Sequence, residues 1–175
     1  PIEVVPNGVD TSAFSKEISQ TELLNLKKEL GIETDDKVLI TTSRLVVKNA
    51  VSDIIKAMPH IKEKTKLLIL GTGYEEKNLI KLSHELGLAN RVKFLGYVAH
   101  KDMPKYLHVS DIFIRPSLSE GFGNSFIEAM AAGVPVIATR VGGIVDFLRD
   151  KETGFFCEVG APEDIARKAE IYLRD

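Results

Sequence analysis

Cysteine is nearly absent from this sequence, and its scarcity excludes two kinds of cross-link. The 175 residues include one cysteine, Cys157, so no internal disulfide can form. No group of cysteines and histidines has the spacing of a zinc site, and we expect a protein without a bound metal. Cys157 lies within an apolar run and is expected to be a small buried side chain. This cysteine usage is typical of a reducing compartment and predicts a cytoplasmic location.

An excess of charge of one sign and long apolar segments are also lacking. Lys and Arg number 23 against 25 Asp and Glu, so the formal net charge of -2 favours neither a nucleic-acid partner nor an anionic membrane. No apolar stretch approaches the roughly 18 residues of a membrane-spanning helix. The sequence starts at Pro1 without a methionine or a leader-like segment, and we expect the natural protein to begin before this residue.

Short apolar runs alternate with segments of helical periodicity along most of the chain. The runs have the length of buried strands and span 37–43, 66–71, 92–96, 111–117, 135–139 and 154–158. Helical spacing is found in 51–58, 79–86, 103–107 and 126–131, and helices are also expected over 21–30 and after Pro162, with a turn at Pro6-Asn7-Gly8. With 44% apolar residues, this order predicts one α/β domain with a doubly wound, Rossmann-like parallel sheet of about six strands.

The strongest candidate motif follows the fourth apolar run, where ligands bind in sheets of this kind. The sequence EGFGNSFIE leads from a strand into a helix. Gly121 and Gly123 let the backbone approach a ligand, and the amides of residues 124–126 lie at a helix N-terminus, which favours a phosphate. Glu120 precedes this loop and Glu128 lies one turn into the helix, so one carboxylate is placed to bind a sugar and the other a ribose.

Two other interpretations of these glutamates stay open on the residues alone. Ser125 and Glu128 match a capping box, in which both side chains satisfy free amides of the helix and bind no ligand. Glu120 and Glu128 are also compatible with the acid and nucleophile of a glycosidase. That chemistry requires a set separation across the reacting bond, which sequence spacing does not supply.

Two cations follow the first predicted strand. Arg44 offers a planar fork and Lys48 a point charge at the edge where a diphosphate is expected, although an ordinary solvated loop is the alternative. Gly71-Thr72-Gly73 lacks the third glycine of a dinucleotide fingerprint and predicts a tight turn, so a nicotinamide cofactor is not expected. The four histidines have no evident partner spacing and are expected at the surface: His60, His84, His100 and His108.

Together these residues resemble the retaining GT-B glycosyltransferases of the group 1, or family four, type, which are similar to glycogen synthase. The hallmark of that family is two glutamates separated by seven residues, met here by Glu120 and Glu128 and followed by AMAAGVPVIAT. Further family landmarks occur in the usual order: VPNGVD at 5–10, SRLV at 43–46, GYV at 96–98 and VGG at 141–143. The chain resembles the C-terminal, donor-binding half of such an enzyme over nearly its whole length.

The resemblance implies a role for each matching residue. Arg44 would contact the diphosphate, Glu120 the hydroxyls of the transferred sugar, and Glu128 the ribose. Val98 would lie beside the base. Arg44, Lys48 and Glu120 are the residues expected to act in catalysis. The backbone that would line the sugar and the phosphate belongs to Gly121, Phe122, Gly123, Asn124 and Ser125.

The sequence departs from the family at one place. The family usually has a Lys-Gly pair five and six positions after the arginine, and this chain has Asn49 and Ala50 there. Lys48 stands one residue early, so it would serve the phosphate only through a flexible loop.

The resemblance implies a retaining hexosyltransferase of polysaccharide biosynthesis, without a cofactor or metal, which transfers a sugar from a UDP- or GDP-sugar to a glycan or lipid-linked acceptor. The N-terminal acceptor domain, which usually carries the catalytic histidine, is expected to lie outside residues 1–175. The chain alone is therefore expected to be inactive, and any membrane association is expected through the other domain. Two alternatives are a non-catalytic nucleotide-sugar-binding module, supported by Asn49-Ala50, and a sugar-nucleotide epimerase of the same fold, disfavoured by the paired glutamates.

Overall fold

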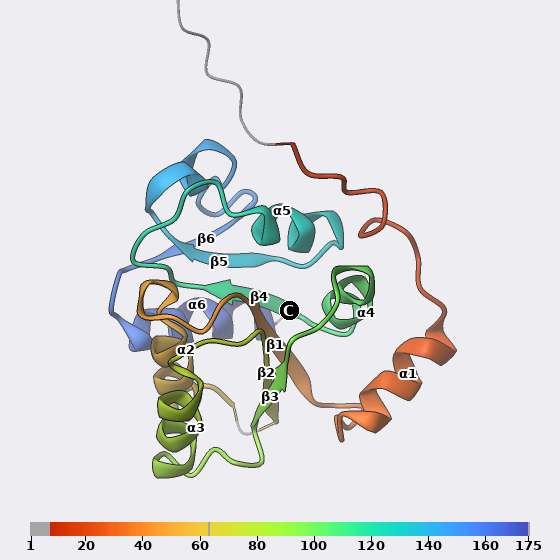
Figure 1. Ribbon diagram of the computed structural model, residues 1–175, viewed down its shortest axis with the longest axis horizontal. Helices are drawn as coiled ribbons and strands as arrows, with labels where there is room; N and C mark the ends of the chain where they lie inside the picture. Colours follow the sequence, from red (N-terminus) through yellow and green to blue (C-terminus); the bar gives the residue numbers. More distant parts are fainter. Residues whose placement is uncertain (1–7, 63, 175) are drawn as a thin grey trace, which may run out of the picture.

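A parallel sheet forms the centre of the computed structural model, which describes residues 8–62 and 64–174 (Figure 1). Its strands are β1 (Lys37–Thr42), β2 (Thr65–Leu70), β3 (Val92–Gly96), β4 (Ile112–Arg115), β5 (Val136–Thr139) and β6 (Gly154–Cys157). They are hydrogen-bonded in the order β3-β2-β1-β4-β5-β6, and every pairing is parallel. The predicted fold class is confirmed. Of the predicted N-terminal turn, Pro6 and Asn7 lie outside the described residues, as does residue 5 of the VPNGVD motif.

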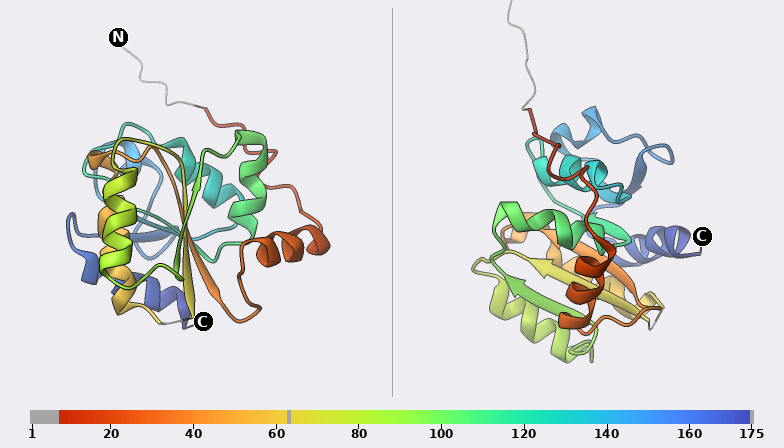
Figure 2. Two further views of the ribbon diagram at one scale, coloured as in Figure 1. Left: turned by 60° about the horizontal axis from the view of Figure 1, so that its bottom comes forward. Right: turned by 90° about the vertical axis from the view of Figure 1, so that its right-hand side faces the viewer.

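In the described part of the chain six α-helices cover the sheet, three on each face (Figure 2). One face is covered by α2 (Val51–Ala57), α3 (Glu76–Glu85) and α6 (Pro162–Leu173), and the other by α1 (Gln20–Glu29), α4 (Met103–His108) and α5 (Asn124–Ala131). Short 3-10 helices also lie in the connections: η1 (Val47–Asn49), η2 (Met58–His60), η3 (His100–Asp102) and η4 (Gly142–Asp146). No helix in the described part of the chain is long and apolar enough to cross a membrane.

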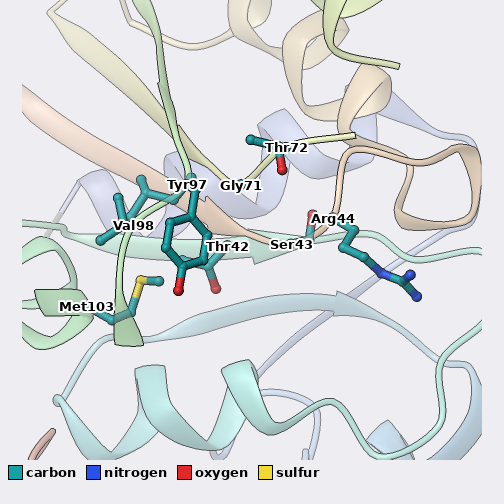
Figure 3. A pocket seen from close by; sticks show the side chains of 9 residues that line it. Thr42, Ser43, Arg44, Gly71, Thr72, Tyr97, Val98 and Met103 are labelled. Carbon is teal, nitrogen blue, oxygen red and sulfur yellow. The ribbon is translucent and has the colours of Figure 1, made fainter. Parts of the chain in front are cut away.

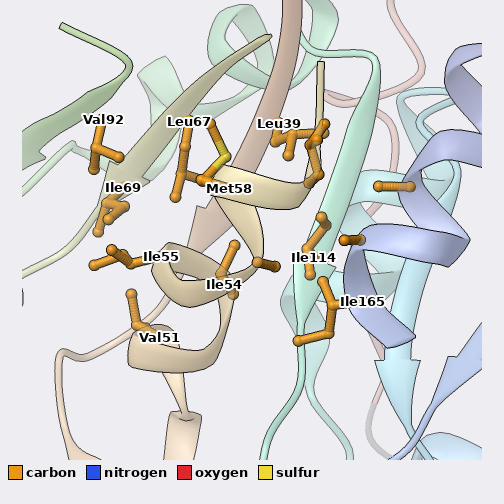
Figure 4. Packing of buried hydrophobic residues seen from close by; sticks show 14 of the residues in the cluster. Leu39, Val51, Ile54, Ile55, Met58, Leu67, Ile69, Val92, Ile114 and Ile165 are labelled. Carbon is orange, nitrogen blue, oxygen red and sulfur yellow. The ribbon is translucent and has the colours of Figure 1, made fainter. Parts of the chain in front are cut away.

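Adjacent residues of one strand belong to opposite hydrophobic cores. Leu39 packs in the core that includes Ile54 of α2 (Figure 4), whereas Ile40 belongs to the core on the other face. That second core contains Phe113 and Phe126, whose rings meet edge to face with centroids 5.4 Å apart. Because helices cover both faces, the strands are apolar on both sides, and this explains the nearly continuous apolar runs in the sequence.

The strand order changes direction between β1 and β4. Strand β1 is followed along the chain by β2 on one side of it, whereas β4 continues the sheet on the other side. Because β1 and β4 are parallel neighbours, the loops that follow Thr42 and Arg115 emerge at the same edge. This is the switch point at which ligands bind in doubly wound sheets.

Candidate functional site

The loops after β1 and β4 are joined directly at the carboxyl edge of the sheet. The amide of Leu118 donates a hydrogen bond to the carbonyl of Lys48, at 2.7 Å. Arg44 and Gly123 therefore lie at the same edge, as their positions after neighbouring parallel strands predict. The side chains of both Arg44 and Lys48 are exposed.

The Gly71-Thr72-Gly73 segment supports the loop that carries Arg44. A Cβ atom on Gly71 would lie 1.8 Å from the carbonyl oxygen of Ser43, and one on Gly73 would lie 2.1 Å from that of Leu45. The amide of Leu45 donates to the carbonyl of Thr72 at 2.9 Å. The two glycines thus allow a close backbone approach, in addition to the tight turn that the sequence predicts.

A cavity of about 260 Å³ opens between the loops that follow β1, β2 and β3 (Figure 3). Val98 lines one part of it, while the guanidinium of Arg44 extends away from Tyr97 and Met103. The two residues expected beside the base and at the diphosphate are therefore parts of one cavity. Its lining consists of Thr42, Ser43, Arg44, Leu70, Gly71, Thr72, Tyr97, Val98 and Met103.

The α5 helix begins at Asn124, and no side chain among the described residues caps it. Gly123 is its N-cap residue, with a left-handed φ of 77° that favours glycine. The amide of Phe126 already donates to the Gly123 carbonyl at 3.0 Å. The first-turn amides that remain to meet a phosphate are therefore those of Asn124 and Ser125.

A buried arginine that the sequence did not single out organises this loop. Arg115, at the end of β4, pairs through Nη2 with Oε2 of Glu120, and its Nη1 donates to Oγ of Ser125 at 2.7 Å. The side chains of Arg115 and Glu120 are only 11% and 10% exposed. Burial lowers the pKa of Arg115, and the negative charge of Glu120 opposes that shift. The sequence does carry a signal for this pair, since Arg115 is a charged residue at the end of an apolar run. A buried arginine is almost always paired, so a nearby carboxylate is expected.

The capping-box interpretation of Ser125 and Glu128 is wrong. Ser125 lies inside the helix, one residue beyond its start, and its hydroxyl accepts a hydrogen bond from Arg115. The backbone of Gly123 ends the preceding loop without help from a side chain. Arg115 comes from a strand whose position relative to α5 depends on the packing of the core. Local sequence spacing therefore could not reveal that Arg115 binds the Ser125 hydroxyl.

The second oxygen of Glu120 and the VGG segment hold the start of the glycine loop. The amide of Gly121 donates to Oε1 of Glu120 at 3.0 Å, and the carbonyl of Gly121 accepts from Gly143 at 2.7 Å. A Cβ on Gly142, whose φ is 53°, would lie 1.8 Å from the Glu120 carbonyl oxygen. Both backbone groups of Gly121 are therefore engaged by the protein. Next along the loop, the ring of Phe122 packs edge to face on Phe147, with centroids 5.5 Å apart.

Glu128 is buried and contacts a histidine from another element. Its Oε1 lies 3.0 Å from Nε2 of His100 in η3, and the two side chains are 12% and 70% exposed. Exposure of the His100 ring agrees with the expected surface position, but its carboxylate partner was not evident from the sequence. His108 also has a partner, since its Nε2 lies 2.9 Å from the carbonyl oxygen of Phe14.

The departure at Asn49 and Ala50 has a structural explanation. Asn49 is 3% exposed, and its Nδ2 donates to the carbonyl of Arg44 at 2.7 Å. Ala50 adopts a left-handed φ of 49°, so the backbone keeps the conformation that the family's glycine suits. Asn49 thus stabilises the loop after β1 through a hydrogen bond to its backbone, and the exposed cation next to it is Lys48.

Acidic and metal-ligating side chains do not gather into a metal site in the part of the chain that the structure covers. Within residues 8–62 and 64–174, no group of three or more His, Cys, Asp and Glu side chains could hold a metal ion.

The fold is that of the C-terminal domain of GT-B transferases. The sequence profile described as Glycosyl transferases group 1 matches residues 24–175, and the chain belongs to this family. The chain is 36% identical to N-acetyl-alpha-D-glucosaminyl L-malate synthase of Bacillus anthracis over 176 residues, which cover 99% of this chain and 45% of the synthase. It spans about half the length of the curated relatives it matches.

Solved structures show the same fold at high similarity. Anabaena HepE in complex with UDP-glucose matches with a TM-score of 0.91 and 28% identity, over 99% of this chain and 48% of HepE. The C-terminal domain of LpcC, a glycosyl transferase group 1 family protein of Francisella tularensis, matches with a TM-score of 0.83 and 25% identity. That match covers 96% of this chain and 89% of the solved LpcC domain, so the two chains have similar extents.

Proposed function

We propose that this chain is the donor-binding domain of a retaining hexosyltransferase that transfers a sugar from a UDP- or GDP-sugar to a glycan or lipid-linked acceptor on the cytoplasmic side. The observation that carries the proposal is the meeting of three features at one edge of the sheet. These are the loop of Arg44, the cavity beside Val98 and the N-terminus of α5. The similarity to HepE, which was solved with UDP-glucose, supports a nucleotide-sugar as the ligand.

Each part of the site suits one part of the donor. The base would lie in the cavity against Val98, and the diphosphate between Arg44 and the free amides of Asn124 and Ser125. Glu120, held by Arg115, would accept hydrogen bonds from the transferred sugar. As the bond between the sugar and the diphosphate breaks, negative charge develops on the diphosphate. The guanidinium of Arg44 and the positive end of the α5 dipole would stabilise this charge.

The acceptor is proposed to bind a domain outside this chain. The chain aligns with about half of these curated relatives, and the LpcC structure that it matches is a C-terminal domain. Residues 1–175 are therefore proposed to bind the donor without transferring its sugar.

Calorimetry and a transfer assay test the two parts of this proposal. We expect the chain to bind UDP or GDP and the corresponding sugars, and to give no transfer of radiolabelled sugar to an acceptor. Arg44→Ala should weaken every ligand that carries a diphosphate and leave binding of the plain nucleoside unchanged. Arg167→Ala, which removes an exposed arginine on α6, is the matched control. Equal losses for nucleoside and diphosphate would remove the assignment of Arg44, and sustained transfer by this chain alone would contradict the two-domain proposal.

The proposed roles of Glu120 and Glu128 are distinguished by comparing the binding of two ligands, the nucleotide-sugar and the free nucleoside diphosphate. Glu120→Gln should weaken a nucleotide-sugar more than the free nucleoside diphosphate, because its proposed partner is the sugar. Glu128→Gln should weaken both ligands alike, by roughly 1–3 kcal/mol for the loss of a charged hydrogen bond. The same loss for both ligands in Glu120→Gln would refute its assignment to the sugar.

A non-catalytic nucleotide-sugar-binding module is the second candidate, and one observation favours it. The family's lysine is replaced by Asn49, whose amide is used inside the loop, so position 49 supplies no cation to the leaving diphosphate. Donor-binding and transfer assays on the whole protein and on its Lys48→Ala variant distinguish the two candidates. Loss of transfer with donor binding retained would favour a catalytic role for Lys48, whereas a whole protein that binds the donor and transfers nothing would favour the module.

A further inference from the structure

His100 connects two parts of the chain that are far apart in sequence. Its Nε2 lies 3.0 Å from Oε1 of Glu128 in α5. Its ring also meets the ring of Phe14 edge to face, with centroids 5.3 Å apart and an interplanar angle of 69°. Phe14 belongs to the segment before α1, so three separate elements meet at this imidazole.

Phe14 is a firm support for the imidazole. Its side chain is fully buried in the core that contains Phe126 of α5, and its carbonyl oxygen lies 2.9 Å from Nε2 of His108 in α4. A buried ring whose backbone is also tied has little freedom to move. The His100 ring is therefore held by two contacts, to Phe14 and to Glu128, although 70% of the side chain is exposed.

The hydrogen bond to His100 limits the orientations of the Glu128 carboxylate. A carboxylate offers about four acceptor positions, and the contact with His100 uses one of them on Oε1. Within residues 8–62 and 64–174 no other group donates to this carboxylate, which leaves its other positions for hydroxyl groups. A group held in its binding geometry before the ligand arrives loses less conformational entropy on binding. The charges next to His100 are partly engaged elsewhere, since Asp102 pairs with Lys105 at 3.4 Å.

We propose that His100 is a positioning residue for ribose recognition, which holds the Glu128 carboxylate in the orientation that accepts the ribose hydroxyls. The edge-to-face contact with the Phe14 ring supports the imidazole of His100. This inference rests on the proposed function, because it requires Glu128 to bind the ribose of a nucleotide donor. It assigns a role to a residue that, on sequence alone, is an ordinary surface histidine.

The test compares three variants of His100 with two ligands by calorimetry. His100→Phe keeps an aromatic ring against Phe14 and removes the hydrogen-bond donor, His100→Gln keeps a donor and removes the ring, and His100→Ala removes both. The ligands are UDP and 2′,3′-dideoxy-UDP, which differ only in the ribose hydroxyls, with the GDP pair used if the chain prefers GDP. His84→Ala, which changes another exposed histidine on α3, is the matched control. Melting temperatures establish that each variant is folded.

We expect His100→Ala and His100→Phe to weaken UDP by roughly 5- to 10-fold, as for the loss of support from a charged hydrogen bond. Both variants should bind the dideoxy ligand as the unmodified chain does. His100→Gln should stay within about twofold of the unmodified chain for both ligands, because an amide N–H can donate to the same oxygen. His84→Ala should change neither affinity.

Other results would overturn the inference in distinguishable ways. Equal losses for UDP and the dideoxy ligand would mean that His100 acts on the base, on the phosphates or on the fold as a whole. Full UDP affinity in His100→Phe would show that the hydrogen bond is not needed. If Glu128→Gln weakens UDP and 2′,3′-dideoxy-UDP equally, Glu128 does not bind the ribose hydroxyls. The inference about His100 then fails, while donor binding by the chain stands. If the unmodified chain binds neither UDP nor GDP, the proposed function itself fails.

Discussion

Replacing Glu120 by glutamine should destabilise the fold as well as weaken sugar binding. Both oxygens of this carboxylate are engaged, one by Arg115 and the other by the amide of Gly121. Arg115 is nine-tenths buried at the end of β4, and burial already lowers its pKa. The substitution removes the charge that offsets this burial and leaves one acceptor oxygen for two donors.

The expected cost follows from the energetics of buried ion pairs. Removal of one partner of such a pair costs about 3–5 kcal/mol, because the other charge is left buried without compensation. Glutamine keeps one acceptor, so we expect Glu120→Gln to lower the free energy of unfolding by about 2–4 kcal/mol. For a domain of this size, 1 kcal/mol corresponds to a change of about 2–4 °C in melting temperature. A decrease of roughly 5–15 °C is therefore expected.

Urea denaturation of a double-mutant cycle measures the coupling. Arg115→Met alone and Glu120→Gln alone should each destabilise the protein, and the double variant should lose about 2 kcal/mol less than the sum, since no unpaired charge remains. Ser125→Ala, which removes the neutral partner of Arg115, is the matched control and should cost about 1 kcal/mol. Strict additivity of the Arg115 and Glu120 substitutions would refute the coupling. Ligand binding by Glu120→Gln should be measured well below its melting temperature.

Three further predictions concern the backbone and the single thiol. Ala50→Gly should raise the free energy of unfolding by about 0.5–1 kcal/mol, because φ is 49° there, and a lower melting temperature would contradict this strain. Gly142→Ala should cost more than about 2 kcal/mol in urea denaturation, since its Cβ would meet the Glu120 carbonyl. Gly160→Ala, with a φ of 68° and open space around it, is the control and should cost only about 1 kcal/mol. Burial raises the pKa of Cys157 to about 12, so the thiol should stay protonated at pH 8 and react with a disulfide reagent only after unfolding; rapid reaction of the native protein would show that it is accessible.

Local patterns in the sequence determined the elements and the edge at which the candidate site lies. Apolar runs such as 37–43 correspond to strands that are covered on both faces, and the helical spacing of 126–131 lies within α5. The order of strands and helices then implies a parallel sheet, whose carboxyl ends share one edge. This is why the sequence alone predicts that Arg44 and Gly123 lie at the same edge.

Side-chain pairing between elements was decided by the tertiary structure alone. His100 meets Glu128 across 28 residues, and Arg115 takes the hydroxyl that local spacing assigns to a helix cap at Ser125. Capping patterns report interactions within one turn, whereas these pairs depend on how η3, β4 and α5 pack around the core. The sequence by itself determined which residues line the carboxyl edge. Their partners depended on packing, because a hydrogen bond requires atoms about 3 Å apart and only the folded core fixes distances between elements that closely.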